Sequence, residues 1–164
     1  MLFPDFTFPS VVDIPVSFFA DNGIKGAAVD IDNTLTGENS NYISEEVRSW
    51  VKEIKASGVN LVIVSNNHEP RVKPFADDIG LAFICETGKP SPRRIAEILR
   101  MLDTEKEETV MVGDQIFTDV LFAGRCGIKS VLVEPMGPDD HSGAAIKRFF
   151  EHPIKWAVRL RRNI

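Results

Sequence analysis

The chain has little of what several classes of protein require. Its two cysteines, Cys85 and Cys126, lie far apart without the spacing of a metal-binding pair, so we interpret both as small apolar groups. No apolar run approaches the ~20 residues of a membrane-spanning helix. Residues 1–10 also lack the basic flank and apolar stretch of a signal peptide. These absences predict a cytoplasmic protein.

Several familiar site motifs are missing as well. The sequence has no Gly-x-x-x-x-Gly-Lys-Ser/Thr phosphate loop, no Gly-x-Gly-x-x-Gly turn and no His-Glu-x-x-His zinc pair. The three histidines, His68, His141 and His152, are scattered, and we expect surface or capping roles for them. Only His68 lies close enough to other polar residues to contact a substrate.

The composition is that of a soluble globular protein. With 164 residues, 43% of them hydrophobic and 26% charged, we expect one domain over residues 1–164 with a core of its own. A net charge of −5 argues against a nucleic-acid partner. The charge is uneven, because residues 144–164 carry six Lys or Arg and one Glu, which makes that segment +5 and leaves −10 for the rest.

We expect residues 140–164 to form a basic helical tail. Its basic and aromatic residues are mixed as in helices that lie on anionic membranes, which would place the protein peripherally at a membrane surface. Alternatively, the tail packs its apolar side on the core and leaves the basic residues in water. The two interpretations are compatible.

Apolar runs and helical periodicities alternate along the middle of the chain. Such alternation predicts an α/β fold, a three-layer Rossmann-like parallel sheet of about five strands with helices on both faces. Pro74 should confine the second main helix to its later part. We expect residues 1–24, which are rich in Phe, to wrap the core with their rings; an aromatic surface for lipid is the alternative. The expected strands are Ile24–Val29, Asn60–Val64, Leu81–Cys85, Thr109–Val112 and Ile128–Val133.

Polar clusters follow four of these strands or lie in the next loop. In parallel sheets, ligands bind beyond the carboxyl ends of the strands, so the clusters should meet. Several acids with one lysine suit a divalent metal beside an anion, since Mg²⁺ prefers carboxylate oxygens and bridges to phosphate. Taken singly, each cluster could be a turn, a helix cap or a surface lysine. The clusters are Asp30/Asp32, Ser65, Lys89 and Asp114/Asp119.

Four segments carry a resemblance to a known superfamily. They are Asp30–Leu35, Val64–Asn67, Gly88–Pro90 and Gly113–Asp119, and they look like the four motifs of the haloacid dehalogenase (HAD) superfamily in the right order. The spellings are similar to the subfamily IIIA phosphatases, in particular the YqeG-like group related to phosphatidylglycerophosphate phosphatases. Two flanking features fit that group, the Ile14-Pro15 segment and Arg71–Ala76. The match covers about residues 25–133, and the sequence beyond Glu134 departs from it.

The resemblance implies a phosphoaspartyl mechanism. Asp30 would be the nucleophile and Asp32 the general acid and base. Mg²⁺ would be held by the Asp30 carboxylate, the Asp32 main-chain carbonyl and the Asp114 carboxylate. The phosphoryl oxygens would be bound by Ser65, Asn66 and Lys89, with help from backbone N–H groups. Asp119 would act indirectly, by orienting Lys89 or a metal-bound water.

The short connections bear on the substrate. Only residues 36–43 separate the first motif from its helix, and 23 residues lie between Ser65 and Lys89, so neither gap holds a cap domain. An open site suits a phosphate on a lipid head group, a protein or a nucleic acid, or a small molecule enclosed by a neighbouring subunit of a homo-oligomer. We therefore expect a Mg²⁺-dependent phosphomonoester hydrolase, with phosphatidylglycerophosphate as the best single substrate. A soluble sugar phosphate, a nucleotide, a phosphoprotein or a non-catalytic binding role are the alternatives.

Overall fold

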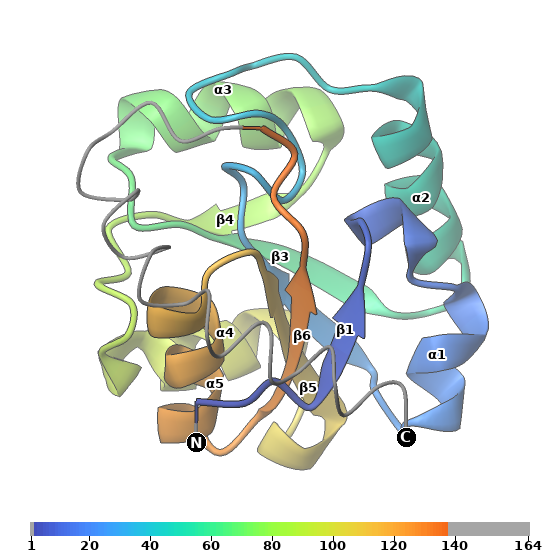
Figure 1. The fold of residues 1–164 in the computed structure, drawn as a ribbon, viewed down its shortest axis with the longest axis vertical. Coiled ribbons are helices and arrows are strands. Elements are labelled where there is room, and N and C mark those ends of the chain that lie inside the picture. Colours follow the sequence, from blue (N-terminus) through green and yellow to red (C-terminus); the bar gives the residue numbers. More distant parts are fainter. Residues whose placement is uncertain (1, 138–164) are drawn as a thin grey trace.

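The computed structural model describes residues 2–137, and the fold is a parallel sheet with helices on both faces (Figure 1). The predicted basic tail at 140–164 lies outside the described residues, so the expectation of one domain over residues 1–164 stays a prediction. The strands run in the order β1-β6-β5-β2-β3-β4 and every pair is parallel. Their bounds are β1 Phe6–Phe8, β2 Gly26–Val29, β3 Asn60–Val64, β4 Ala82–Ile84, β5 Thr109–Gly113 and β6 Lys129–Val133.

The predicted fold class is confirmed, but the sheet has six strands rather than five. The additional strand is β1, which pairs with β6 at the edge of the sheet, with Phe6 opposite Val131. Asp5 reinforces the edge, because the Ser130 N–H donates to its Oδ2 at 2.8 Å and its own N–H donates to Ser130 Oγ at 3.0 Å. A three-residue strand between prolines is too short to show the alternation by which strands are recognised.

Two layers of helices bury the two faces of the sheet. Successive strand residues point to opposite faces, so Ala27 and Val29 belong to one core cluster and Ala28 to the other. The first cluster is covered by α1, α2 and α3, and the second by α4 and α5. Figure 1 shows α1 and α2 on one side of the sheet and α4 and α5 on the other. The helices are α1 Val16–Asp21, α2 Glu45–Ala56, α3 Glu69–Ile79, α4 Ile95–Leu102 and α5 Leu121–Cys126.

The aromatic N-terminal segment packs on the first of these faces. The Phe6 and Phe8 rings meet Phe18 of α1 edge to face, with centroids 4.9 and 5.3 Å away. Trp50 of α2 donates its indole N–H to the Ile14 carbonyl at 3.0 Å, which ties the segment to the helix layer. The rings of Phe6, Phe8 and Phe18 thus pack against one another and on the core, whereas Phe3 is exposed.

Helix α3 differs from its prediction. It begins at Glu69, although Pro74 lies inside it and was expected to restrict it to its later part. The N–H that Pro74 lacks would have bonded only to the carbonyl four residues earlier, close to the helix start, while the Arg71 and Val72 N–H groups both bond to the His68 carbonyl. Burial of Val72 and Phe75 holds the rest of the helix on the sheet.

The connections leave the carboxyl ends of the strands open. Residues 30–44 join β2 to α2, and β3 is followed by α3 and β4. Within residues 2–137 there is accordingly no cap domain, as predicted. No helix of this part of the chain is long and apolar enough to cross a bilayer.

Candidate active site

The register of the sheet gathers the predicted residues at one edge. Val29 of β2 lies opposite Val112 of β5 on one side and Ile63 of β3 on the other. The ladder extends one step further, because the Asp30 N–H donates to the Val112 carbonyl at 3.0 Å. The residues that follow the three strands, Asp30, Ser65 and Asp114, therefore emerge side by side.

A tight turn follows Asp30. The N–H groups of Thr34, Leu35 and Thr36 all point to the Ile31 carbonyl, at 3.1, 2.8 and 3.3 Å. Asn33 has a φ of 61°, a left-handed conformation that Asn tolerates better than most residues. The turn lets the following loop fold back over Asp32.

Lys89 is the cation at the centre of the site. Its ammonium donates to Asp30 Oδ1 at 2.8 Å, to Asp119 Oδ1 at 2.7 Å and to the Val64 carbonyl at 2.8 Å. The side chain is only 2% exposed. Burial alone would lower the pKa of Lys89, but the charges of Asp119 and Asp30 outweigh that effect and raise its pKa above the ordinary value. Lys89 therefore stays charged and holds two carboxylates together.

Asp30 is electrostatically crowded. Burial raises the pKa of its carboxyl to about 6, the charge of Lys89 opposes that rise, and the nearby Asp119 adds to it. Ionisation of Asp30 is thus less favourable than in a free aspartate. A further cation beside Asp30 would lower its pKa and stabilise the charged form that a nucleophile needs.

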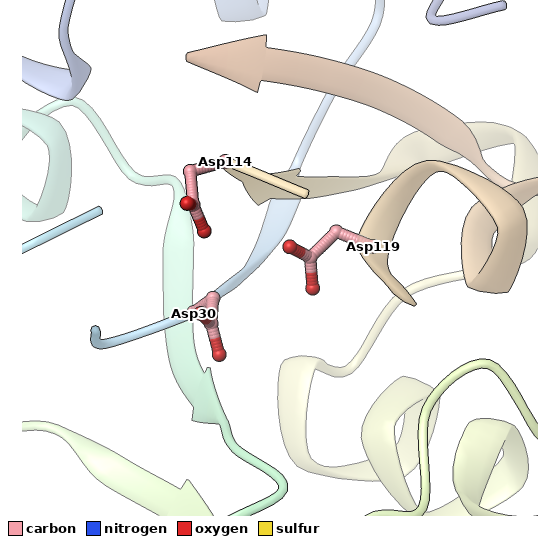
Figure 2. A group of neighbouring side chains, drawn as sticks. All are labelled: Asp30, Asp114 and Asp119. Atoms are coloured by element: carbon pink, nitrogen blue, oxygen red, sulfur yellow. The ribbon is translucent and has the colours of Figure 1, made fainter. Parts of the chain in front are cut away.

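Three carboxyl groups from three segments surround one space (Figure 2). Asp30 follows β2, Asp114 follows β5 and Asp119 lies in the π-helical turn Ile116–Val120. One oxygen of each lies within 4.8 Å of the others, and Asp114 is fully buried. A compact set of carboxylate oxygens is what Mg²⁺ prefers, so these residues fit the predicted ion.

Gly113 is what allows Asp119 to reach this space. A Cβ at residue 113 would lie 2.3 Å from the Asp119 carboxyl carbon, so the carboxyl packs directly on the glycine backbone. The Gln115 N–H donates to Asp119 Oδ2 at 3.2 Å and holds its other oxygen. The contact of Asp119 with Lys89 matches its expected role of orienting that lysine, while its part in the carboxylate cluster was not foreseen.

Asp32 is held by residues that the sequence reasoning did not assign. Its Oδ1 accepts from Arg71 Nη2 and from the Asn39 N–H, both at 2.8 Å, and its Oδ2 accepts from Asn67 Nδ2 at 2.6 Å. Asn67 could have been found, because it belongs to the motif segment after β3. The only signal for Arg71 was its place in the group-specific segment Arg71–Ala76.

Ser65 and Asn66 lie in the loop that follows β3. Ser65 is 1% exposed, and its hydroxyl accepts the Asn67 N–H at 3.1 Å. The Asn66 side chain binds the Lys89 backbone twice, accepting its N–H at 2.7 Å and donating to its carbonyl at 3.0 Å. Asn66 thus fixes the position of Lys89, and phosphate binding by Ser65, Asn66 and Lys89 stays a prediction.

Comparison with known proteins gives the family. A model of the haloacid dehalogenase-like hydrolases matches residues 36–127. The chain belongs to the haloacid dehalogenase-like hydrolase family. Among the relatives of this HAD protein, "Probable phosphatase YqeG" of Bacillus subtilis is 32% identical over 161 residues, which cover 98% of this chain and 94% of that one. This near-complete match to a probable phosphatase supports a phosphatase activity for the HAD protein.

Two further likenesses are more distant. Phosphatidylglycerophosphate phosphatase 1 of Arabidopsis thaliana, a chloroplastic and mitochondrial protein, is 29% identical over 123 residues, which cover 70% of the HAD chain and 35% of the plant protein. The cobalt-bound deoxy-D-mannose-octulosonate 8-phosphate phosphatase of Haemophilus influenzae superposes with a TM-score of 0.56 at 17% identity, over 67% of this chain and 69% of that one. The second likeness concerns the fold alone.

Proposed function

We propose that the protein is a Mg²⁺-dependent phosphatase that hydrolyses phosphomonoesters through a phosphoaspartyl intermediate on Asp30. The observation that carries the proposal is the buried cluster of Asp30, Asp114 and Asp119 with Lys89 bound to it. Mg²⁺, held by Asp30, Asp114 and the Asp32 carbonyl, would neutralise charge on the transferred phosphoryl group.

The carboxylates divide the chemical work. Asp30 attacks phosphorus, and the bond from phosphorus to the leaving oxygen breaks as the new bond forms. Asp32 gives a proton to that oxygen, then takes one from the water that hydrolyses the aspartyl phosphate. Asn67 and Arg71 orient Asp32 for both steps through their bonds to its two oxygens. Ser65 and Lys89 bind the phosphoryl oxygens.

The presence of Asp32 supports ester hydrolysis over dehalogenation. A halide leaves as a stable anion and needs no acid, whereas an alkoxide leaving from phosphorus must be protonated. Asp32 lies two residues after the nucleophile, with both its oxygens hydrogen-bonded. An acid fixed in that position supports a first step in which the leaving group requires a proton.

Phosphatidylglycerophosphate is the substrate that we propose. The named activity of the plant relative supports it, as does the absence of a cap over the site within residues 2–137. The basic segment 144–164 supports a peripheral position on an anionic membrane surface. A soluble phosphate enclosed by a second copy of the chain is the competing substrate class.

The decisive experiment compares lipid and soluble substrates. Phosphate release is measured from vesicles that contain phosphatidylglycerophosphate and from a panel of sugar phosphates, nucleotides, a phosphopeptide and an aryl phosphate, with Mg²⁺ or with chelator. We expect Mg²⁺-dependent release with preference for the vesicles, and no release by Asp30→Asn. Undiminished turnover by Asp30→Asn would refute the mechanism, and preference for a soluble ester would refute the substrate. Binding without turnover across the whole panel would favour a non-catalytic role.

The acid role of Asp32 has its own test. Asp32→Asn should slow the first step much more for an alkyl phosphate than for a nitrophenyl phosphate, because nitrophenolate leaves without a proton. Single-turnover measurements separate this step from hydrolysis of the intermediate. Equal slowing of both esters would show that Asp32 does not protonate the leaving group.

A further inference from the structure

Arg71 lies beside the acid and base of the site without belonging to any of its four motif clusters. It is in the first turn of α3, and its side chain is 18% exposed. Besides Asp32, its guanidinium donates from Nη2 to the Ser40 carbonyl at 2.8 Å and from Nη1 to Asn41 Oδ1 at 2.9 Å. It is thereby fixed between α3 and the loop that follows the first motif.

The bond between Arg71 and Asp32 does not use all that a guanidinium offers. Arg has five N–H donors and typically grips a carboxylate with two parallel bonds. Here one Nη2 N–H bonds to Asp32 and the other to the Ser40 carbonyl, while Nη1 uses one of its two N–H groups, on Asn41. Nε is buried and out of reach of a ligand, so within residues 2–137 the second Nη1 N–H is the donor that remains. An arginine that only positioned Asp32 would be expected to bind its carboxylate with two parallel N–H bonds. Arg71 therefore has donor capacity left for another anion.

The position of Arg71 relates it to the leaving group. Lys89 lies on the Asp30 side of the site, bound to the proposed nucleophile, so its charge acts at the transferred phosphoryl group rather than at the leaving group. Asp32 is placed to protonate the leaving oxygen, and Arg71 lies beside Asp32. In the proposed reaction, the part of the substrate attached to the leaving oxygen would therefore lie beside Arg71.

We propose that Arg71 forms a second anion-binding subsite, which receives a phosphate or phosphodiester group carried by the leaving group. This inference rests on the proposed function and specifies its substrate class: a phosphomonoester with a further phosphoryl anion a few atoms from the leaving oxygen. Arg suits this task because its guanidinium stays charged and can donate to a phosphate oxygen while its other N–H groups hold Asp32 and the loop. The same chemistry occurs in a lipid head group and in a free bisphosphate.

A binding experiment tests the subsite without requiring turnover. In the Asp30→Asn background, glycerol 1,3-bisphosphate and glycerol 3-phosphate are titrated calorimetrically in the presence of Mg²⁺. We expect the bisphosphate to bind about tenfold or more tightly, and Arg71→Gln to remove that difference, since it removes a hydrogen bond between charged groups. Equal affinities with Arg71 present, or an equal loss for both ligands in Arg71→Gln, would overturn the proposal.

Lys73 offers a matched control on the same helix. Its ammonium pairs with Asp77 one turn away at 2.7 Å, and its side chain is 53% exposed. Lys73→Gln removes the same unit of charge two residues from Arg71 and should leave both affinities unchanged. A loss of the bisphosphate preference in Lys73→Gln equal to that in Arg71→Gln would show a general effect of charge and refute a local subsite. Arg71→Lys, which keeps the charge but not the fork, should retain part of the preference and serves if Arg71→Gln fails to fold.

Kinetics with the otherwise unmodified enzyme separate the two proposals and the two sources of the anion. Arg71→Gln should lower kcat/KM on glycerol 1,3-bisphosphate and on phosphatidylglycerophosphate vesicles by similar factors. Both factors should exceed the loss on glycerol 3-phosphate, which reports only the orientation of Asp32. A loss confined to the vesicles would refute the subsite, because the soluble ligand also carries a second phosphoryl anion across the same glycerol unit. If no ester is turned over but the bisphosphate preference depends on Arg71, the proposed function fails and the subsite stands. If esters are turned over but the bisphosphate shows no Arg71-dependent preference, the proposed function stands and the subsite fails.

Discussion

Lys89 and Asp119 form an ion pair at 2.7 Å in which both side chains are only 2% exposed. The pair is shielded from water, and Asp30 shares the same ammonium at 2.8 Å. Loss of the Lys89 ammonium would therefore leave the Asp30 and Asp119 carboxyl groups without their cation. The ion pairs that position the site residues therefore also affect the stability of the fold.

Replacing that cation should be costly. We expect Lys89→Met to lower the free energy of unfolding by about 3–5 kcal/mol, the range for breaking a buried pair on one side only. Urea unfolding of metal-free protein measures the change. Lys89→Met combined with Asp119→Asn should recover part of the loss, because one of the two stranded charges is gone. A single-mutant loss below about 1 kcal/mol would contradict this account.

Gly113 should be intolerant of even a methyl group. Gly113→Ala would place a Cβ 2.3 Å from the Asp119 carboxyl and displace it from Lys89. We expect a loss of stability of about 1–3 kcal/mol, as for overpacked cores, together with a large drop in phosphatase activity. Gly37→Ala is the control, because its Cβ would meet nothing nearer than Ser40 Cβ at 3.9 Å. Equal behaviour of the two variants in thermal unfolding and in turnover would argue against the close approach.

The crowding of Asp30 predicts a pH-dependent response to metal. Because its folded pKa of about 6 lies above the ordinary 3.8, the stability that its bound proton provides is complete below about pH 4 and is lost as the pH rises through 6. Mg²⁺ should therefore stabilise most above pH 6, by about 2.7 kcal/mol at 100 times its Kd. Thermal unfolding of the metal-free and Mg²⁺-loaded protein from pH 4.5 to 8, compared with Asp30→Asn, isolates this share. A metal effect larger at about pH 5 than at about pH 8 would reverse the expected sign.

The two cysteines should differ in reactivity. Burial raises the pKa of Cys126 to about 11, with a small opposing effect of Lys106, and the residue is 3% exposed. Only about one Cys126 in a thousand would be a thiolate at pH 8, so a charged disulfide reagent should react with the half-exposed Cys85 first. Cys126→Ser should show the labelling rate of the unsubstituted protein. Rapid labelling of Cys85→Ser would disprove the assignment.

The regular elements were predictable because their patterns are local. Helix α2 has Ser44 at its N-cap, with the Val47 N–H bonded to the Ser44 hydroxyl at 3.3 Å, and buries Trp50 and Ile54 as their spacing predicts. Strand β3 occupies the predicted residues, Asn60–Val64. Strand β1 was not predicted, because only its pairing with β6 identifies it as a strand. No pattern within its three residues indicates that pairing.

The same distinction applies to the site. Strand-end placement brought Asp30, Ser65 and Asp114 together in advance, since parallel strands share one carboxyl edge. The attachment of Arg71 to Asp32 could not be derived, because it depends on how the loop through Ser40 folds against α3. Side-chain partners between a loop and a distant helix follow from tertiary packing, which a local pattern does not encode.

The pairing of β1 with β6 sets an order on the assembly of the chain during synthesis. The Asp5 and Ser130 backbones bind one another's side chains across 125 residues, so β1 can be fixed in its place only after β6 has been made. Until then β1 lacks its partner, and an unpaired strand invites association with other chains. A deletion that removes residues 2–9 would leave the five-residue β6 as the edge strand in place of the three-residue β1. A very short edge strand is a poor template for pairing with another copy, so β1 limits such association in the finished sheet.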